Sequence, residues 1–308
     1  MKLALPDMIS NSYFPAIAAI ELGFFKQEGL DVTLELIFPV DKSYAALRDG
    51  AVEFVAGSAH SALAAFPRWR GVQLLCAQAQ GMYWFLVMHR DLKPRRGDIG
   101  VVKGCRIGAA PWVDLGLRRL LIEAGIDVER DKVKIAPVPG TQGAGINFGI
   151  TAAKALEDRQ LDGFWANGMG AEVAVRRGVG VVVLDVRRGD GPQECFNYTM
   201  ASMATTDQLI RRSPDKAAAA VRAIVKTQAA LKANDARADH VGRKLFPAAE
   251  AALIGELIRR DLPYYDAEIS QTFVSGMNQF ARDVGILDGD VAYENVVATQ
   301  FAPLWKKG

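Results

Sequence analysis

The sequence lacks most of the patterns that mark membrane, metal or nucleic-acid-binding proteins. No run of 18 apolar residues occurs in its 308 residues, so no segment is expected to insert into a membrane. The net charge of +2 comes from interspersed acids and bases, which excludes a basic stripe for nucleic acid. Three cysteines and three histidines occur without CxxC or HExxH spacing, and we expect no metal and no cofactor. Cys76, Cys105 and Cys195 are predicted to be buried free thiols.

The composition is that of an ordinary globular protein, with half of the residues hydrophobic and about a quarter charged. The length predicts two domains. The opening MKLALPD is interrupted too early for a signal peptide and is typical of a first strand. We therefore leave two locations open, the periplasm with an export signal upstream of Met1, or the cytoplasm.

Strand and helix patterns alternate over the first two-thirds of the chain, which predicts mainly parallel sheets covered by helices on both faces. The predicted strands are Lys2–Pro6, Val32–Phe38, Glu53–Ala56, Val72–Ala77, Tyr83–Met88, Cys105–Ala109, Val133–Pro137, Asp162–Ala166 and Val179–Asp185. The predicted helices are Tyr13–Leu22, Asp41–Asp49, His60–Trp69, Val113–Ala124, Gly149–Arg159 and Met169–Arg177.

From Thr206 onward the pattern is helical, and Pro214 is placed to open a helix. Two polar segments, KPRRGDIGVVK and RRGDGPQEC, look like crossings between units. They predict a first lobe over residues 1–92, an inserted second lobe over 93–187, and a return to the first lobe over 188–308. The C-terminal helices are expected to pack on the first lobe.

Ligands in parallel α/β sheets gather where strands end and helices begin. Those turns hold amides, hydroxyls and large aromatic residues with few charges, a composition that suits a largely apolar cleft. For each side chain a structural role is the alternative: Ser12 is also a credible N-cap of the helix at Tyr13–Leu22, and the aromatic residues could pack in the core.

Evidence for catalysis is weak. The sequence has no GxSxG elbow, and GTQGAG at 140–145 lacks the GK[ST] ending of a phosphate loop. His60 lies beside Ser58 and Ser61 and could act as a base, but a hydrogen-bonded helix residue explains it as well.

Three segments together resemble a known family. YFPAIAAIELGFFKQEGLDV, VKGCRIGAAPWVDLGLRRLLIEAGIDVERDKVKIAPVP and MATTDQLIRRSPDKAAAAVRAIVKTQAAL are similar, in order, to substrate-binding proteins of nitrate, sulfonate and taurine ABC importers. That group includes the NMT1/THI5-like pyrimidine-precursor binders. The resemblance implies a type II periplasmic-binding-protein-like α/β fold, whose two lobes, joined by two crossing hinge segments, close on a ligand.

The resemblance also implies a set of ligand-binding residues and no catalytic residue. Together with the turn analysis, it predicts binding by Asn11, Ser12, Tyr13, Gly57, Ser58, His60, Tyr83, Trp84, Pro111, Trp112, Val113, Asn167 and Tyr198. Their aromatic rings indicate a small aromatic or heterocyclic ligand, with a carboxylate or sulfonate seated at helix N-termini. The scarcity of arginine at these turns argues against nitrate alone.

The resemblance further implies delivery of the ligand to an ABC transporter permease by a monomeric binding protein. Enzymes of the same fold are the alternative. The pyrimidine-precursor synthases carry a lysine where this chain has Gly57, and they have a cysteine-rich motif that is absent here; His60 lies one residue out of step. A decarboxylase acting on hydroxylated phthalates and a cytoplasmic ligand sensor remain further alternatives.

Overall fold

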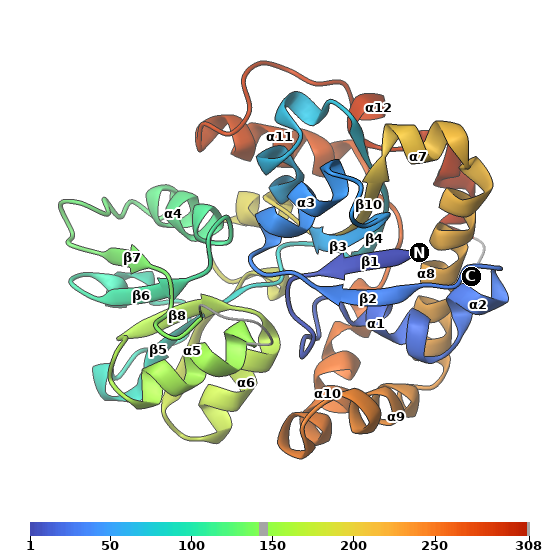
Figure 1. Cartoon of the computed structure of the whole chain (residues 1–308). Coiled ribbons are helices and arrows are strands. Elements are labelled where there is room, and N and C mark those ends of the chain that lie inside the picture. The colour runs from blue at the N-terminus through green and yellow to red at the C-terminus, as the bar shows by residue number, and fades with distance from the viewer. Residues whose placement is uncertain (142–146, 307–308) are drawn as a thin grey trace. The chain divides into compact units, whose positions relative to one another are not determined.

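The computed structural model describes residues 1–141 and 147–306, which form two compact units (Figure 1). Unit 1 comprises Met1–Gly81 and Asn197–Gly308, and unit 2 comprises Met82–Phe196. The sequence prediction placed these two boundaries after residues 92 and 187. Part of the GTQGAG segment, residues 142–145, lies outside the described residues.

Unit 1 is built on a five-stranded sheet in the order β2-β1-β3-β10-β4. Four strands are parallel, and β10 runs antiparallel between β3 and β4. The central strands are apolar because both of their faces are covered: Leu3 of β1 lies opposite Leu34 and Phe54. The strands are β1 (Lys2–Leu5), β2 (Thr33–Leu36), β3 (Phe54–Ser58), β4 (Val72–Ala79) and β10 (Ala201–Thr206).

Helices cover both faces of the sheet in unit 1. In Figure 1, α3 lies on one face, and α1 and α2 lie on the other together with α8. The first part of the chain supplies α1 (Phe14–Glu21), α2 (Phe24–Gln27), α3 (Val40–Arg48), η1 (Ala59–Ala64) and η2 (Pro67–Trp69).

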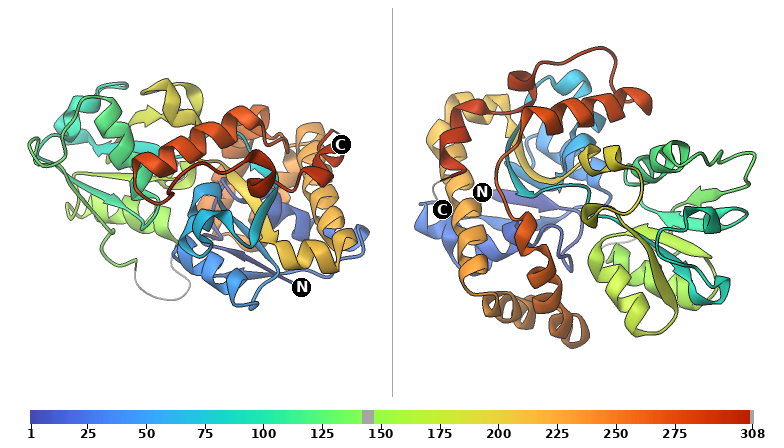
Figure 2. Two further views of the ribbon diagram at one scale, coloured as in Figure 1. Left: turned by 90° about the horizontal axis from the view of Figure 1, so that it is seen from above. Right: turned by 180° about the vertical axis from the view of Figure 1, so that it is seen from behind.

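The C-terminal third is helical and belongs to unit 1 (Figure 2). Its longest helix opens at Pro214 as predicted, because a proline in the first helical turn costs no hydrogen bond. The elements are α7 (Asp207–Arg212), α8 (Pro214–Ala233), α9 (Ala236–Leu245), α10 (Ala248–Asp261), η7 (Leu262–Tyr264), α11 (Gln271–Asp283), α12 (Tyr293–Val296) and η8 (Thr299–Leu304).

Unit 2 is a second five-stranded sheet in the order β7-β6-β8-β5-β9, with α4 on one face and α5 and α6 on the other (Figure 1). The strand β5 runs antiparallel to β8 and β9. The elements are β5 (Phe85–His89), η3 (Arg90–Leu92), η4 (Ile99–Val102), β6 (Arg106–Ala109), α4 (Asp114–Glu123), β7 (Lys134–Ala136), α5 (Phe148–Glu157), β8 (Gly163–Ala166), α6 (Gly168–Arg176), β9 (Gly180–Asp185), η5 (Val186–Arg188) and η6 (Gln193–Asn197).

The alternation of strands and helices is confirmed, with three differences. The hydrophobic pattern does not predict β10, because its small residues ASMATT carry little strand signal. The two antiparallel strands, β5 and β10, follow the two points where the chain changes unit. The helix predicted over His60–Trp69 is wrong: two short 3₁₀ helices replace it, because Pro67 and the left-handed backbone of Arg68 and Trp69 interrupt it.

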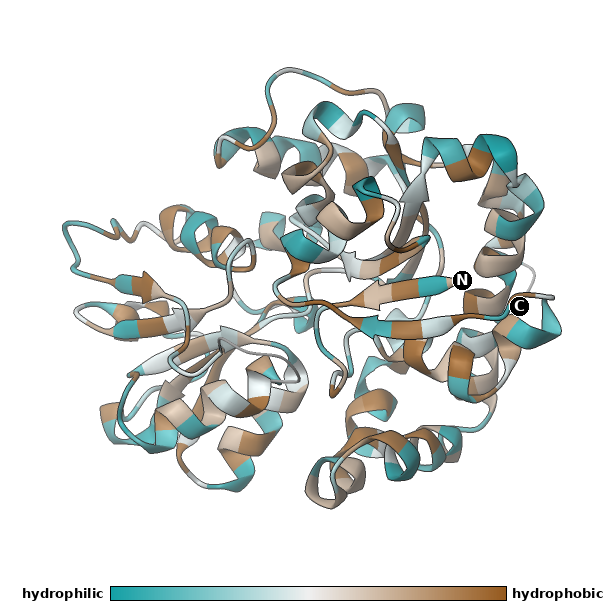
Figure 3. Ribbon diagram, viewed as in Figure 1, coloured by the Kyte–Doolittle hydropathy of each residue, from teal (hydrophilic) through white to brown (hydrophobic). Residues whose placement is uncertain are grey.

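Hydrophobic and hydrophilic residues alternate around the helices, as expected where one side of a helix covers a sheet (Figure 3). The three cysteines are free and buried, as predicted. In the part of the chain that the structure describes, no helix is long and apolar enough to cross a membrane.

Candidate functional site

Each sheet gathers the predicted residues at one edge. In unit 1 the strands β1, β3 and β4 end at the edge where the antiparallel β10 begins, because Ala201 pairs with both Ser58 and Ala79. Residues that follow β1 and β3 and residues that precede β10 therefore meet there. We call this the carboxyl edge of unit 1; it carries Asn11, Ser12, Tyr13, Ser58, His60, Tyr198 and Thr199.

The turn before α1 borders this edge. Helix α1 begins at Phe14 with Tyr13 at the N-cap position, and no side chain of its own turn caps it. Gln78 of β4 supplies the acceptor instead, because its Oε1 receives the Ala16 N–H at 3.2 Å. The predicted capping role of Ser12 is therefore wrong. Its buried hydroxyl has no hydrogen-bond partner within residues 1–141 and 147–306.

A second hydroxyl shares this property. Thr199 is fully buried just before β10, and its Oγ1 also lacks a hydrogen-bond partner among the residues described. Leaving a buried hydroxyl unsatisfied costs about 1–3 kcal/mol. Two such groups at one strand edge mark a place where polar atoms of a ligand would stabilise the protein. Asn11 is held differently, since its Nδ2 donates to Asp261 Oδ2 at 2.8 Å.

His60 belongs to a buried polar and aromatic cluster at the same edge. Its Nε2 lies 3.5 Å from Ser61 Oγ, which in turn lies 2.6 Å from Ser58 Oγ. The Phe280 ring of α11 meets the His60 ring edge-on at 5.4 Å and stacks on Tyr198 at 4.5 Å. This packing brings Tyr198 and Phe280, which are distant in the sequence, together with the neighbouring Ser58, His60 and Ser61.

Gly57 has a packing role. A Cβ built there would lie 3.2–3.3 Å from Val40 and Tyr44 side chains of α3. A larger residue would push these side chains away by a few tenths of an ångström, so glycine lets α3 pack closely on the sheet. The Tyr44 hydroxyl also donates to the Ser58 carbonyl oxygen at 3.1 Å, so α3 fixes the end of β3.

Unit 2 has an equivalent carboxyl edge. The strands β6, β8 and β9 end where the antiparallel β5 begins, because Phe85 pairs with both Ala166 and Asp185. Tyr83 and Trp84 precede β5, so this edge gathers them with the residues that follow the other strands. The predicted members are Tyr83, Trp84, Pro111, Trp112, Val113 and Asn167.

The aromatic residues of this edge form a contiguous group. The ring centroids of Tyr83 and Trp84 are 5.1 Å apart, and those of Trp84 and Trp165 are 6.1 Å apart. A Cβ at Gly116 of α4 would lie 3.1 Å from the Trp84 ring, so glycine there lets the helix pack on the indole. Trp165 is not among the residues predicted from the sequence, because its position inside a predicted strand is typical of an ordinary core residue.

Two predicted residues of unit 2 have clear local roles. Asn167 caps α6, because its Oδ1 accepts hydrogen bonds from the backbone N–H groups of Met169 and Gly170 at 3.1 and 3.3 Å. Trp112 has a left-handed backbone with φ of +69°, which is costly for a large side chain. Val113 then stands at the N-cap position of α4. A strained tryptophan at a strand-to-helix turn is typical of a ligand-contacting position.

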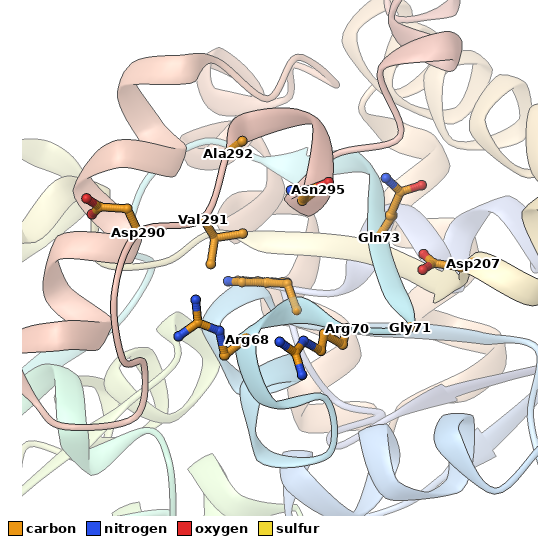
Figure 4. Close-up of a pocket in the computed structure, with 10 residues that line it drawn as sticks. Arg68, Arg70, Gly71, Gln73, Asp207, Asp290, Val291, Ala292 and Asn295 are labelled. Atoms are coloured by element: carbon orange, nitrogen blue, oxygen red, sulfur yellow. The ribbon is translucent and has the colours of Figure 1, made fainter.

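A separate pocket of about 450 Å³ lies at the opposite edge of the unit 1 sheet, where β4 begins and β10 ends. Figure 4 shows Arg68 and Arg70 on one side of it and Asp290 and Asn295 on the other. Burial raises the pKa of the Asp207 carboxyl that also lines it. None of the predicted ligand-binding residues lines this pocket.

Solved structures share the fold over nearly the whole chain. A protein of Bordetella bronchiseptica RB50 is 19% identical with a TM-score of 0.77, covering 99% of this chain and 96% of that one. The periplasmic sulfonate-binding protein SsuA of a sulfonate ABC transporter from Methylobacillus flagellatus KT is 15% identical with a TM-score of 0.70, covering 100% and 93%. A mutant of DSZB in complex with biphenyl-2-sulfinic acid is 15% identical with a TM-score of 0.66, covering 100% and 99%.

These likenesses show the two-unit α/β fold of periplasmic binding proteins, as predicted. No curated protein sequence matches the chain. The sequence profile of the NMT1/THI5 like family matches residues 10–238, well over half of the chain. The protein therefore belongs to the NMT1/THI5-like family.

Proposed function

We propose that this protein is the solute-binding component of an ABC importer. It holds a small aromatic or heterocyclic organic molecule, carrying a carboxylate or sulfonate, between its two units. The observation that carries this proposal is the pair of buried hydroxyls, Ser12 and Thr199, without hydrogen-bond partners in the described structure at the carboxyl edge of unit 1. A ligand that accepts or donates there relieves their desolvation cost.

The aromatic residues of unit 2 support a planar ligand. Tyr83, Trp84 and Trp165 present rings in contact with one another, and flat ligands gain area and stacking energy on such surfaces. Hydroxyls on one unit and rings on the other give the mixture of few polar groups and large apolar surface that organic-ligand sites use.

The mechanism follows from the division of the site between two units. Each unit supplies only half of the ligand contacts. The ligand therefore stabilises the closed state, in which both units contact it, and enters or leaves in the open state. We propose that a monomer in the periplasm performs this cycle and presents the closed form to a permease. The sulfonate-binding SsuA of the same fold is a precedent for such a role.

A panel of aromatic acids, aromatic sulfonates and pyrimidines tests the proposal by thermal shift and calorimetry. Ser12→Ala is expected to weaken binding about 2- to 10-fold, the value of one hydrogen bond. The same variant should leave the ligand-free melting temperature unchanged or higher, because it removes an unsatisfied buried hydroxyl.

The matched control is Thr227→Ala in α8, a buried hydroxyl that already donates to the Ala223 carbonyl oxygen at 2.7 Å. It should leave ligand affinity unchanged. Stabilisation of the wild-type protein by inorganic anions alone would contradict the ligand class, and equal affinities of wild type and Ser12→Ala would contradict the site.

A second candidate function is catalysis by an enzyme of this fold. DSZB is described as a desulfurization enzyme, and the buried His60 beside Ser61 is a group that could move a proton. Mass spectrometry separates the candidates: a solute-binding protein returns its ligand unchanged after long incubation. Conversion of the ligand, lost in His60→Ala, would favour the enzyme.

A further inference from the structure

The pocket at the opposite edge of the unit 1 sheet has the size of a small-molecule site. Its volume of about 450 Å³ lies within the range of about 300–1,000 Å³ that such sites occupy. Its walls all belong to unit 1 and come from three parts of the chain, residues 68–73, Asp207 and residues 290–295. None of these residues belongs to the carboxyl edge of unit 1.

The turn that precedes β4 forms one wall of the pocket and has an unusual backbone. Arg68 and Trp69 are consecutive residues with φ of +56° and +61°, a left-handed region that residues other than glycine seldom adopt. Two side-chain hydrogen bonds hold the turn: Arg68 donates to the Asp288 carbonyl oxygen, and the Trp69 indole donates to Asn278 at 3.1 Å. Strain that the surrounding structure maintains in this way is concentrated at ligand sites.

Arg70 and Asp207 bring opposite charges to this pocket, and in the described structure they do not pair with each other. The exposed guanidinium of Arg70 forms no hydrogen bond or ion pair with residues 1–141 and 147–306. The buried Oδ1 of Asp207 has no hydrogen-bond partner in the same ranges. The two residues are neighbours through the backbone, since the Asp207 N–H donates to the Gly71 carbonyl oxygen at 3.0 Å. Figure 4 shows their side chains at separate places on the pocket wall.

The charge of Asp207 is not fully compensated within the protein. Burial raises the pKa of its carboxyl, although Arg211 acts in the opposite direction. A simple anion bound to Arg70 would leave this carboxylate unsatisfied and would be repelled by it. A ligand that carries both a negative and a positive group satisfies both residues, because its charges then complement those of the pocket.

The rest of the lining is neutral. Gln73 is held in place, because its Nε2 donates to two backbone carbonyl oxygens of α12 and the residue after it, at 2.8 and 3.4 Å. Asn295 adds a second amide, and Trp69 and Val291 supply apolar surface (Figure 4). The pocket thus combines two opposite charges with amides and an apolar patch.

We propose that this pocket is a second binding site, whose ligand is a zwitterionic α-amino acid. The carboxylate of the amino acid lies on Arg70, whose planar guanidinium offers paired N–H donors. Its ammonium group donates to Asp207 Oδ1, and its side chain lies against Trp69 and Val291. This site does not depend on the proposed solute-binding function. The two sites lie at opposite edges of one sheet, so each binds its ligand without displacing the other.

A thermal-shift screen of the common L-amino acids on the full chain, followed by calorimetry, tests the proposal. The amino acid that stabilises the protein most is compared with two analogues of the same side chain, one without the ammonium group and one without the carboxylate. For L-leucine these are 4-methylpentanoate and 3-methylbutylamine. Each analogue is expected to bind about 10-fold or more weakly, because it loses a charge-assisted hydrogen bond.

Arg70→Gln and Asp207→Asn each remove one charge of the pocket. Arg70→Gln should no longer distinguish the amino acid from its amine analogue, and Asp207→Asn should no longer distinguish it from its acid analogue. These ratios are the readout, since a general folding defect weakens all three molecules alike. Arg237→Gln, at an exposed arginine of α9 outside the pocket, is the matched control and should preserve both ratios.

Three results would overturn the proposal. In the first, no amino acid stabilises the wild type; in the second, the analogues bind as tightly as the amino acid. The third is a loss of amino-acid affinity in Ser12→Ala as large as that in Arg70→Gln, which would place the amino acid at the carboxyl edge of unit 1. The first two leave the solute-binding function standing, because that function is tested with other ligands at the other edge.

Discussion

Gln78 joins three parts of unit 1 beneath the candidate site, and replacing it by alanine tests that architecture. The side chain is fully buried in β4. Its Oε1 accepts the Ala16 N–H of α1 at 3.2 Å, and its Nε2 donates to the Ser202 carbonyl oxygen of β10 at 3.1 Å. Gln78→Ala removes both of these hydrogen bonds, while the Ala16 N–H keeps its second bond, to the Tyr13 carbonyl oxygen at 3.1 Å.

The expected cost follows from the two lost hydrogen bonds and from the cavity that the truncated side chain leaves. Each lost hydrogen bond costs about 0.5–1.5 kcal/mol, the cavity costs about 1–3 kcal/mol more, and the freed glutamine entropy returns at most about 2 kcal/mol. We expect the free energy of unfolding to fall by about 2–3 kcal/mol. In a unit of this size, this corresponds to a melting temperature lower by roughly 4–12 °C. Ligand affinity should fall as well, because the turn that carries Ser12 loses its anchor.

Thermal and urea unfolding of the ligand-free protein measure the effect. Gln73→Ala in the same strand is the control: its Nε2 also donates to two carbonyl oxygens, of Glu294 and Val297, but nearer to solvent. Water can replace those bonds, so we expect a loss under about 1 kcal/mol. Equal losses in the two variants, or a loss under about 1 kcal/mol in Gln78→Ala, would refute the reasoning.

Two further predictions concern unit 2. Trp112→Gly should be more stable than Trp112→Ala by about 1 kcal/mol, because φ of +69° suits glycine alone, while both variants lose ligand affinity; equal melting temperatures would contradict this. Hydrogen bonds from Arg106 lower the pKa of Asp162, so its charged form is favoured on folding. The stability lost in Asp162→Asn should be full at pH 7 and shrink as pH falls below about 3.9 toward the lower folded pKa. Urea unfolding at pH 7 and pH 3 checks it, and a loss that does not change with pH would argue against the pair.

The sequence predicted the elements of the fold well where the hydrophobic pattern is local. The β1–α1 and β9 regions show the hydrophobic periodicity expected of strands and helices. Pro214 opens α8, because proline fits the first turn of a helix. The failures involve residues whose structure depends on distant partners. ASMATT becomes a strand because β3 and β4 offer it two free edges. The helix predicted over His60–Trp69 is interrupted where Arg68 and Trp69 take a left-handed backbone, and the buried Trp69 indole there donates to Asn278 of α11.

The candidate site was likewise predictable only in part from the sequence. Residues at strand ends, such as Ser12, Trp112 and Asn167, could be proposed from the sequence, because the carboxyl ends of parallel strands share one edge. The roles of these residues could not. Whether Ser12 caps α1 depends on Gln78, which lies 62 residues from Ala16 and takes the capping position.

Arg187 is the clearest example of a residue whose contacts the sequence alone could not predict. In the sequence it is one of two adjacent arginines in a polar segment. Only the pairing of β5 with β9 places it over Tyr83, more than one hundred residues earlier in the chain. The strands and helices follow from the hydrophobic periodicity of neighbouring residues, which the sequence shows directly. The partners of each buried polar group are set by which strands pair, and the tertiary structure alone decided them.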